Sequence, residues 1–293
     1  MRGLYVKLLA VALLWGGTYI AGRQLAHTLP FLVASALRYG VAALTLLALL
    51  FWIEGRMPRL NRWQWGRVTL LGATGVFAYS AFFFAALGMI PASRAALIMA
   101  TNPAWIALGA ALFLGARLRP LQVAGIAIAV AGTWIVITRG DVTALSGAVG
   151  AGELLSLGAA FSWTAYTLIG RGLFAAGAAP SSLAATTLAA LIGGAGLLLA
   201  APLQWSQVEW SRLGWADTWA GLYMGVLATA LAFVWFYDGV KAIGPARAAV
   251  FNNLVPAFAV LLAALLLGEA VEPSMVVGGI VTITGVWLTN KEA

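Results

Sequence analysis

Apolar runs of roughly 20 residues recur along the whole chain, and only short polar segments separate them. A helix rises about 1.5 Å per residue, so a run of this length crosses the roughly 30 Å hydrocarbon layer of a bilayer. Charged residues make up 9% of the 293 residues, far below the share of about a quarter in soluble domains. The pattern predicts an all-α integral membrane protein with ten transmembrane helices, near residues 4–26, 30–53, 66–89, 91–115, 119–138, 148–171, 180–201, 215–240, 244–268 and 272–290.

The first apolar run contains Trp15 and ends in polar sequence without a small-residue cleavage site, which predicts a retained helix and not a signal peptide. If the N-terminus is cytoplasmic, most of the 17 Lys and Arg residues fall on that side of the bilayer. They are Arg2, Lys7, Arg56, Arg59, Arg62, Arg67, Arg117, Arg119, Arg171, Lys241, Arg247 and Lys291. This positive-inside bias predicts a bacterial-type inner (plasma) membrane protein with both termini in the cytoplasm. It also accounts for the net charge of +8 without a nucleic-acid partner.

The second half of the chain repeats the first. An offset of 153 residues, the separation of Arg94 and Arg247, also carries Pro103 to Pro256 without a gap. The same offset relates three pairs of glycines, Gly115 and Gly268, Gly125 and Gly278, and Gly132 and Gly285. The sequence therefore predicts two five-helix repeats, at residues 1–140 and 147–293. Because five is odd, the second repeat would be inverted, an arrangement that places a binding site near the bilayer midplane and allows alternating access.

Three segments carry a family resemblance. LLLGEAVEPSMVVGGIVTITGVWL at 265–288, LFLGARLRPLQVAGIAIAVAGTWI at 112–135 and ALLWGGTYIAGR at 12–23 resemble the EamA repeats of the drug/metabolite transporter superfamily. The whole chain most resembles the YddG-type aromatic amino-acid exporters of that superfamily. One departure is that the Gly-Glu pair common in the family is present as Gly268-Glu269 but is replaced by Gly115-Ala116 in the first repeat, so a symmetric role for the carboxylate is not expected.

Amides lie within two related apolar segments, RAALIMATNPA at 94–104 and RAAVFNNLVPA at 247–257. Asn102 precedes Pro103, and Asn252 occupies the position equivalent to Met99, which shares a helix face with Asn102. An amide in hydrocarbon costs free energy unless it is hydrogen-bonded. These amides either satisfy carbonyls that the prolines leave unbonded or line a substrate path. Pro103 and Pro256 are the predicted hinges, because proline removes a helix hydrogen bond.

Aromatic and hydroxyl side chains recur at helical spacing near the middle of several predicted helices. The stripes that we expect to line a substrate cavity are Trp15, Thr18 and Tyr19, Trp163 and Tyr166, and Tyr79 and Phe83. Such faces suit a solute with an apolar body and a polar head. The alternative is ordinary packing or an interfacial aromatic belt, although Trp15 and Trp163 lie well inside their helices.

Three arginines are candidates for buried or gating charges. Arg38 lies inside the second predicted helix, where it either binds a substrate carboxylate or, as the sequence favours, bonds carbonyls of a neighbouring helix. Arg94 and Arg247 occupy equivalent helix starts near opposite membrane faces. They are expected to be snorkelling anchors, with a gate as the alternative.

The first predicted helix contains no Asp or Glu, so it lacks the membrane-embedded carboxylate that proton-coupled cation exporters use. The chain has one His and no Cys, and no metal site, phosphate loop or cofactor is expected. The sequence thus predicts a facilitator that exports amino acids with aromatic or other apolar side chains, and similar small amphipathic metabolites. Its expected partners are a small-molecule substrate and the lipid bilayer, with no obligate protein partner. The alternatives are a proton-coupled exporter of cationic drugs or polyamines, and a membrane scaffold without flux.

Overall fold

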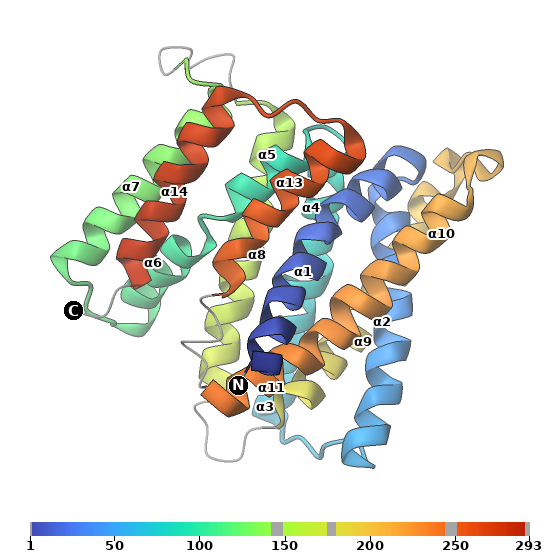
Figure 1. The fold of residues 1–293 in the computed structure, drawn as a ribbon. Helices are drawn as coiled ribbons and strands as arrows, with labels where there is room; N and C mark the ends of the chain where they lie inside the picture. The colour runs from blue at the N-terminus through green and yellow to red at the C-terminus, as the bar shows by residue number, and fades with distance from the viewer. Residues whose placement is uncertain (1, 142–148, 175–179, 244–250, 291–293) are drawn as a thin grey trace.

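The computed structural model describes residues 2–141, 149–174, 180–243 and 251–290, and within them every regular element is a helix (Figure 1). The first half contains α1 (Arg2–Thr28), α2 (Phe31–Glu54), α3 (Arg62–Leu71), α4 (Tyr79–Leu87), α5 (Ala92–Met99), α6 (Asn102–Leu114) and α7 (Pro120–Ile137). The second half contains α8 (Ala151–Phe174), α9 (Ser182–Ala200), α10 (Trp215–Leu222), α11 (Ala232–Ile243), α13 (Val255–Leu267) and α14 (Pro273–Asn290). Short 3-10 helices are η2 (Ala201–Gln207), η3 (Trp210–Arg212) and η5 (Phe251–Leu254).

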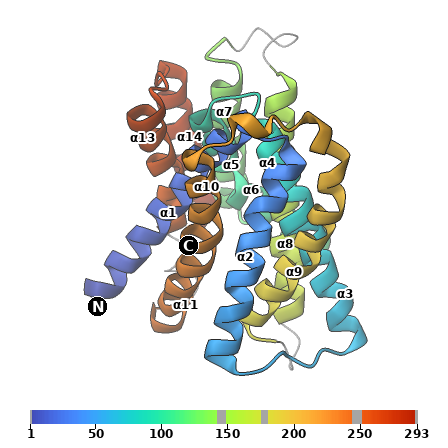
Figure 2. The ribbon, with the colours of Figure 1, turned by 90° about the vertical axis from the view of Figure 1, so that its right-hand side faces the viewer.

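The helices are those of a multi-pass membrane protein. Within the described ranges, 7 helical segments are long and apolar enough to cross a bilayer, and a shorter apolar helix covers Phe251–Leu267. The helices α8 and α14, of 24 and 18 residues, pack against them in the same bundle (Figures 1 and 2). Together these segments agree with the ten helices expected from the sequence.

The boundaries of several helices differ from those expected, and three of the differences have a visible local feature. The helix expected at 66–89 begins at Arg62, because Asn61 forms a capping box with Gln64 in which each side chain accepts from the other residue's backbone N–H at 2.9 Å. The helix expected at 91–115 is interrupted after Met99. The helix expected at 244–268 lies partly outside the described residues, and its described part begins at Phe251.

Two described helices have a proline in their first turn, α6 after the break at residues 100–101 and α13 directly after the 3-10 helix η5. Pro103 lies in the first turn of α6 and Pro256 in the first turn of α13, where the missing N–H costs little. At the first break the Thr101 hydroxyl donates to the Ile98 carbonyl at 2.6 Å and accepts from the Trp105 indole at 3.0 Å. The Ile98 carbonyl at this break is therefore bonded by Thr101, through its hydroxyl and through its backbone N–H at 3.2 Å.

Two unusual backbone features occur once in each half. A π-helical segment, η1 (Gly72–Ala78), joins α3 to α4, and a second, η4 (Tyr223–Leu231), joins α10 to α11. Such segments are rare and lie here at positions 153 residues apart, as Gly72 and Gly225 show. The helices α6 and α13 both end at a glycine with positive φ, +66° at Gly115 and +65° at Gly268, a conformation that favours glycine. The two halves thus share backbone features as well as sequence.

Helices from the first half pack on helices from the second. The helix α1 packs on α13 and α11, α2 on α9, and α4 on α8 (Figures 1 and 2). The helices α7 and α14 cross so closely that a Cβ added at Gly125 would lie 2.7 Å from the Gly285 carbonyl oxygen, and one at Gly278 would lie 2.6 Å from the Gly132 oxygen. The paired glycines of the sequence therefore form one helix crossing.

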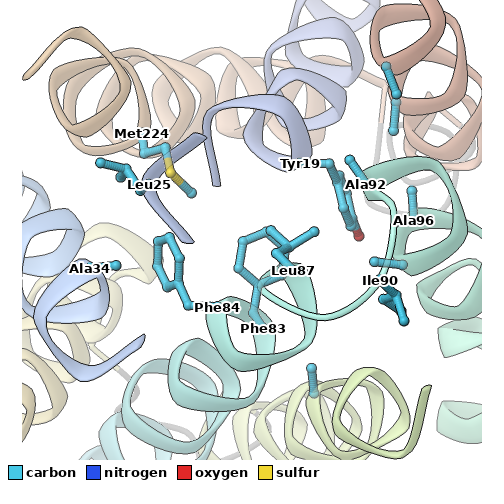
Figure 3. Close-up of a cluster of buried hydrophobic side chains, with 14 of the residues drawn as sticks. Tyr19, Leu25, Ala34, Phe83, Phe84, Leu87, Ile90, Ala92, Ala96 and Met224 are labelled. Carbon is cyan, nitrogen blue, oxygen red and sulfur yellow. The ribbon is translucent and has the colours of Figure 1, made fainter. Parts of the chain in front are cut away.

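The largest described core cluster lies where α1, α4 and α5 meet helices of the second half. Figure 3 shows part of it, with Tyr19 of α1, Phe83, Phe84 and Leu87 of α4, and Met224 of η4. This cluster joins the two halves and includes the predicted site residues Tyr19, Tyr79 and Phe83.

Candidate functional site

Five predicted site residues form a continuous series of ring contacts, called here the aromatic chain. Its members in spatial order are Tyr19, Phe83, Tyr79, Trp163 and Tyr166, with successive ring centroids 5.4, 5.6, 5.2 and 5.1 Å apart. The separations are those of favourable aromatic pairs. The chain begins on α1, crosses α4 and ends on α8, so it connects the two halves of the protein.

Helix periodicity and helix packing together explain the aromatic chain. Tyr79 and Phe83 are four residues apart on α4, and Trp163 and Tyr166 are three apart on α8, so each pair shares one helix face. The helix α4 packs on α8 and on α1, which brings these faces together with Tyr19. In Figure 3 the Tyr19 and Phe83 rings lie within the buried cluster. Tyr19 is 6% exposed, Phe83 2% and Tyr79 9%, so this face is enclosed by protein and does not face lipid.

Arg38 of α2 lies beside the aromatic chain. Its guanidinium carbon is 5.5 Å from the Phe83 ring centroid and 5.2 Å from that of Tyr39. The residue is 8% exposed, and its Nε and Nη1 atoms are buried without a hydrogen-bond partner among the described residues. The expected hydrogen bonds from these two atoms to carbonyls of a neighbouring helix are therefore not found.

Asn102 lies next to the α8 end of the chain. The Thr164 hydroxyl donates to its side-chain oxygen at 3.3 Å, and its amide nitrogen lies 3.9 Å from the Met99 sulfur. Thr164 directly follows Trp163 of the aromatic chain, and Met99 packs against the same core cluster. The structure therefore places Asn102 against α8, beside the residue that follows Trp163, and Met99 against the core cluster that contains Tyr19, Tyr79 and Phe83.

Trp15 and Thr18 lie apart from the aromatic chain. The Trp15 indole donates to the Ala228 carbonyl at 2.9 Å, and its ring contacts Phe233 and Phe236 at 5.9 and 5.4 Å. The Thr18 hydroxyl donates to the Trp15 carbonyl of its own helix at 2.6 Å. These contacts are with α1, η4 and α11, so Trp15 joins a second aromatic group with Phe233 and Phe236.

Asn252, the second predicted amide, also lies apart from the aromatic chain. Asn252 belongs to η5, next to α13, and its side-chain oxygen is buried without a partner among the described residues. The helices α1 and η5 pack together, with a Tyr5 to Phe251 ring contact at 6.0 Å. Arg247, the predicted equivalent of Arg94, lies outside the described residues.

Arg94 is buried, which corrects its assignment as a snorkelling anchor. It is 2% exposed and forms ion pairs with Glu153 at 3.1 Å and with Glu272 at 3.3 Å. These three residues, called here the charge cluster, join α5 to α8 and to the connection before α14. Snorkelling fails because protein covers the start of α5. Two carboxylates from the second half pair with Nη1 and Nη2 instead, while Nε is buried without a partner among the described residues. The arrangement is consistent with the gate that was the alternative.

Glu269 has a structural role that the sequence did not reveal. Its carboxylate accepts from the backbone N–H groups of Ala92 and Ser93 at 2.8 and 3.0 Å, and from the Ser93 hydroxyl at 2.6 Å. It therefore caps α5 from the opposite half, where the local cap position is Pro91. The turn at Gly268 precedes Glu269, and Ala116 cannot make such a cap in the first half.

The structure adds two neighbours of the site that sequence reasoning missed, Tyr39 and Thr164. Tyr39 directly follows Arg38, and Thr164 follows Trp163, so sequence adjacency to a candidate was the only available signal. Among the described residues there is no group of three or more His, Cys, Asp or Glu side chains that could hold a metal ion.

Comparison with known proteins extends over the whole chain. The model of the EamA-like transporter family matches residues 3–138 and 150–291. The uncharacterized transporter YyaM of Bacillus subtilis is 27% identical over 97% of this chain and 92% of its own length. A probable amino-acid metabolite efflux pump of Escherichia coli is 27% identical over 97% of this chain and 93% of its own. A protein known from a crystal structure has the same fold, with a TM-score of 0.67, 23% identity and 98% coverage of both chains.

Proposed function

This chain belongs to the EamA-like transporter family, and from that premise we propose that it exports amino acids with aromatic or other apolar side chains. The observation that carries the proposal is the aromatic chain between the two halves, which includes the Tyr19 and Tyr79 hydroxyls, with Asn102 hydrogen-bonded to Thr164, the residue after Trp163. Ring faces suit an apolar side chain, and the amide and hydroxyls suit the polar backbone of an amino acid. A relative described as a probable amino-acid metabolite efflux pump supports this substrate class.

We further propose that residues 1–140 and 147–293 are inverted repeats that exchange conformations to give alternating access. The repeated π segments and glycine caps support this, as does the packing of helices across the halves. The break before Pro103 and the change from 3-10 helix to α-helix before Pro256 supply positions at which the chain can bend. The charge cluster would hold one end of the bundle closed, and Arg94 would be the gating residue.

Transport down a gradient is favoured over proton coupling. No acid belongs to the aromatic chain, and the acids nearest the bundle interior already have partners. Glu153 is paired with Arg94, and Glu269 caps α5. Asp217, which is 5% exposed, accepts from the Thr28 hydroxyl, the Gln24 amide and the Gly214 N–H. A proton-coupled exporter of cationic drugs or polyamines would require one of these carboxylates to leave its partner.

The transport test is uptake of radiolabelled Phe, Trp, Thr and Met into proteoliposomes, beside spermidine and a lipophilic cation, with and without a pH gradient. Amino-acid flux that ignores the gradient is expected. Trp163→Leu and Asn102→Ala are each expected to lower this flux about tenfold, since each removes roughly 1–1.5 kcal/mol of contact with substrate.

Trp134→Leu is the matched control, because Trp134 is another half-buried indole and lies on α7, which packs mainly on α14, α5 and α6 and not on the helices of the aromatic chain. Its flux is expected to stay within about twofold of the parent. Flux of the cations alone, driven only by a pH gradient, would refute the proposed substrate class.

Orientation can be tested directly, because the chain contains no Cys. We propose that both termini are cytoplasmic, which places exposed Ser206 outside and exposed Met57 inside. A membrane-impermeant maleimide is expected to label Ser206→Cys in intact cells, and to label Met57→Cys only after permeabilisation. The reverse pattern would invert the proposed topology.

A further inference from the structure

We propose that Arg38 is the receptor for the carboxylate of the transported molecule, and that the protein therefore selects ligands with a carboxylate on an apolar body. The inference deepens the proposed function and rests on it for the location of the substrate site. It reverses the expectation from sequence that Arg38 has a structural role.

The first observation is that Arg38 is buried and incompletely bonded. It is 8% exposed, yet Nε and Nη1 have no hydrogen-bond partner among the described residues. A buried guanidinium is normally paired with a carboxylate or bonded to carbonyls, because burying a charge without partners is costly. None of the ion pairs found in the described part of the chain includes Arg38. The side chain therefore has unused capacity for an anion.

The second observation is how the guanidinium is held. The rings of Tyr39 and Phe83 lie 5.2 and 5.5 Å from its central carbon, and cation–π attraction to them offsets part of the cost of burial. Ring faces attract the cation but accept few of its N–H groups, which project from the edge of the planar group. Those edges are the part of arginine that binds a carboxylate with two parallel hydrogen bonds. Each of the two edges, Nε with Nη2 and Nη1 with Nη2, includes one nitrogen without a partner among the described residues. The Tyr79 hydroxyl is a further hydrogen-bonding neighbour of the guanidinium, and Nε and Nη1 are the atoms left for a carboxylate.

The third observation is its place in the molecule. Arg38 is seven residues from the start of α2 at Phe31, about 10 Å into the helix by its rise per residue. It shares Phe83 with the aromatic chain and interacts electrostatically with the Tyr19 and Tyr79 hydroxyls. A molecule whose apolar part lies on these rings would bring its carboxylate within reach of the guanidinium. The same charge would repel a cationic ligand, which disfavours drugs and polyamines.

The test compares matched pairs of ligands that differ only in charge. Calorimetry on the purified full-length protein would measure binding of phenylalanine against phenylalaninamide, and of 3-phenylpropanoate against 3-phenylpropanamide. The carboxylate of each pair is expected to bind at least about tenfold more tightly, the effect of one charge-assisted hydrogen bond. In Arg38→Met this preference is expected to vanish, while the amides keep their affinity within about threefold.

Arg67→Met is the matched control, since Arg67 also stacks on a ring, that of Trp63 at 5.0 Å, but lies on α3 away from the aromatic chain. It should keep the full preference. If Arg38→Met does not give a monodisperse protein, Arg38→Gln replaces it and should lose most of the preference, because a neutral amide cannot supply a charge-assisted hydrogen bond.

An unchanged preference in the Arg38 variant, or no carboxylate preference in the parent protein, overturns the inference. The two ligand pairs also distinguish failure of the carboxylate site from failure of the proposed amino-acid substrate. If only the phenylpropanoate pair shows a preference that depends on Arg38, the carboxylate site stands and the assignment to amino acids fails.

Discussion

Replacing Arg94 with methionine is expected to lower the free energy of unfolding by about 3–5 kcal/mol, because it leaves a buried carboxylate without its counter-charge. Arg94 and Glu153 have side chains that are 2% and 7% exposed, with 3.1 Å between Nη1 and Oε1. The remaining bond to Glu153 in this region is the Gly150 N–H at 3.1 Å, which cannot balance a full charge. Denaturant unfolding of the purified protein in detergent measures the loss.

Two comparisons make this prediction specific. Arg212→Met removes the cation of an exposed pair with Glu209, 66% and 62% exposed, and should cost less than about 1 kcal/mol. The double variant Arg94→Met with Glu153→Leu should recover most of the stability, because apolar side chains can replace a buried ion pair at little cost. A double variant as unstable as Arg94→Met would show that the loss arises from packing and not from the uncompensated charge.

The double variant Arg94→Met with Glu153→Leu also tests whether the charge cluster acts as a gate. If the charge cluster holds one end of the bundle closed, its loss should increase maleimide labelling of a cysteine placed at Ser93, a buried residue beside Arg94, well above the labelling seen with the cluster intact. Equal labelling in both backgrounds would assign the cluster a stabilising role only.

Gly285→Ala is expected to destabilise the protein by about 2–3 kcal/mol through overpacking at the α7–α14 crossing. A Cβ at Gly285 would contact the backbone nitrogen of Ala129 and lie 2.6 Å from the Gly125 oxygen and 2.7 Å from the Ala129 Cα. Backbone atoms cannot rotate away as a flexible side chain can, so the two helices must separate. The separation would also weaken the contact of the Thr133 and Thr282 hydroxyls, now 3.4 Å apart.

Gly40→Ala is the control, and its expected effect on the free energy of unfolding is opposite to that of Gly285→Ala. Gly40 lies within α2, and nothing lies within 4 Å of the Cβ that alanine would add. Alanine there should raise the free energy of unfolding by up to about 1 kcal/mol, since it lowers the entropy of the unfolded chain without a clash. If both alanines had the same effect, close backbone packing would not be the reason for Gly285.

Part of the site could be predicted from sequence because the residues concerned share a helix face. The pairs Tyr79 and Phe83 on α4, and Trp163 and Tyr166 on α8, follow from the helical period alone. Periodicity could not show that Trp15 faces Phe233 and Phe236 and not the same rings as Tyr19, although both belong to α1. That distinction depends on which helices surround α1.

The surroundings of Arg38 and Arg94 could be predicted even less from sequence than those of the aromatic residues. A single sequence gives Arg38 and Arg94 as charges in apolar helices, and the expected roles were a structural bond and a lipid-surface anchor. The structure pairs Arg94 with two acids from the second half and leaves Nε and Nη1 of Arg38 unbonded between rings. The partners are 59 and 178 residues from Arg94, so no local pattern identifies them.

The sequence by itself determined the membrane setting, the helix content and the similarity of the two halves. Each depends on local composition or on matching positions, since apolar length specifies a membrane-spanning helix and the 153-residue offset relates like residues. Tertiary structure alone decided which helices meet. It therefore decided which side chains form the aromatic chain, which charges are paired, and that Nε and Nη1 of Arg38 have no hydrogen-bond partner among the described residues. The physical reason is that burial and pairing are properties of contacts between distant segments, and the apolar pattern of a membrane helix leaves its partner undetermined.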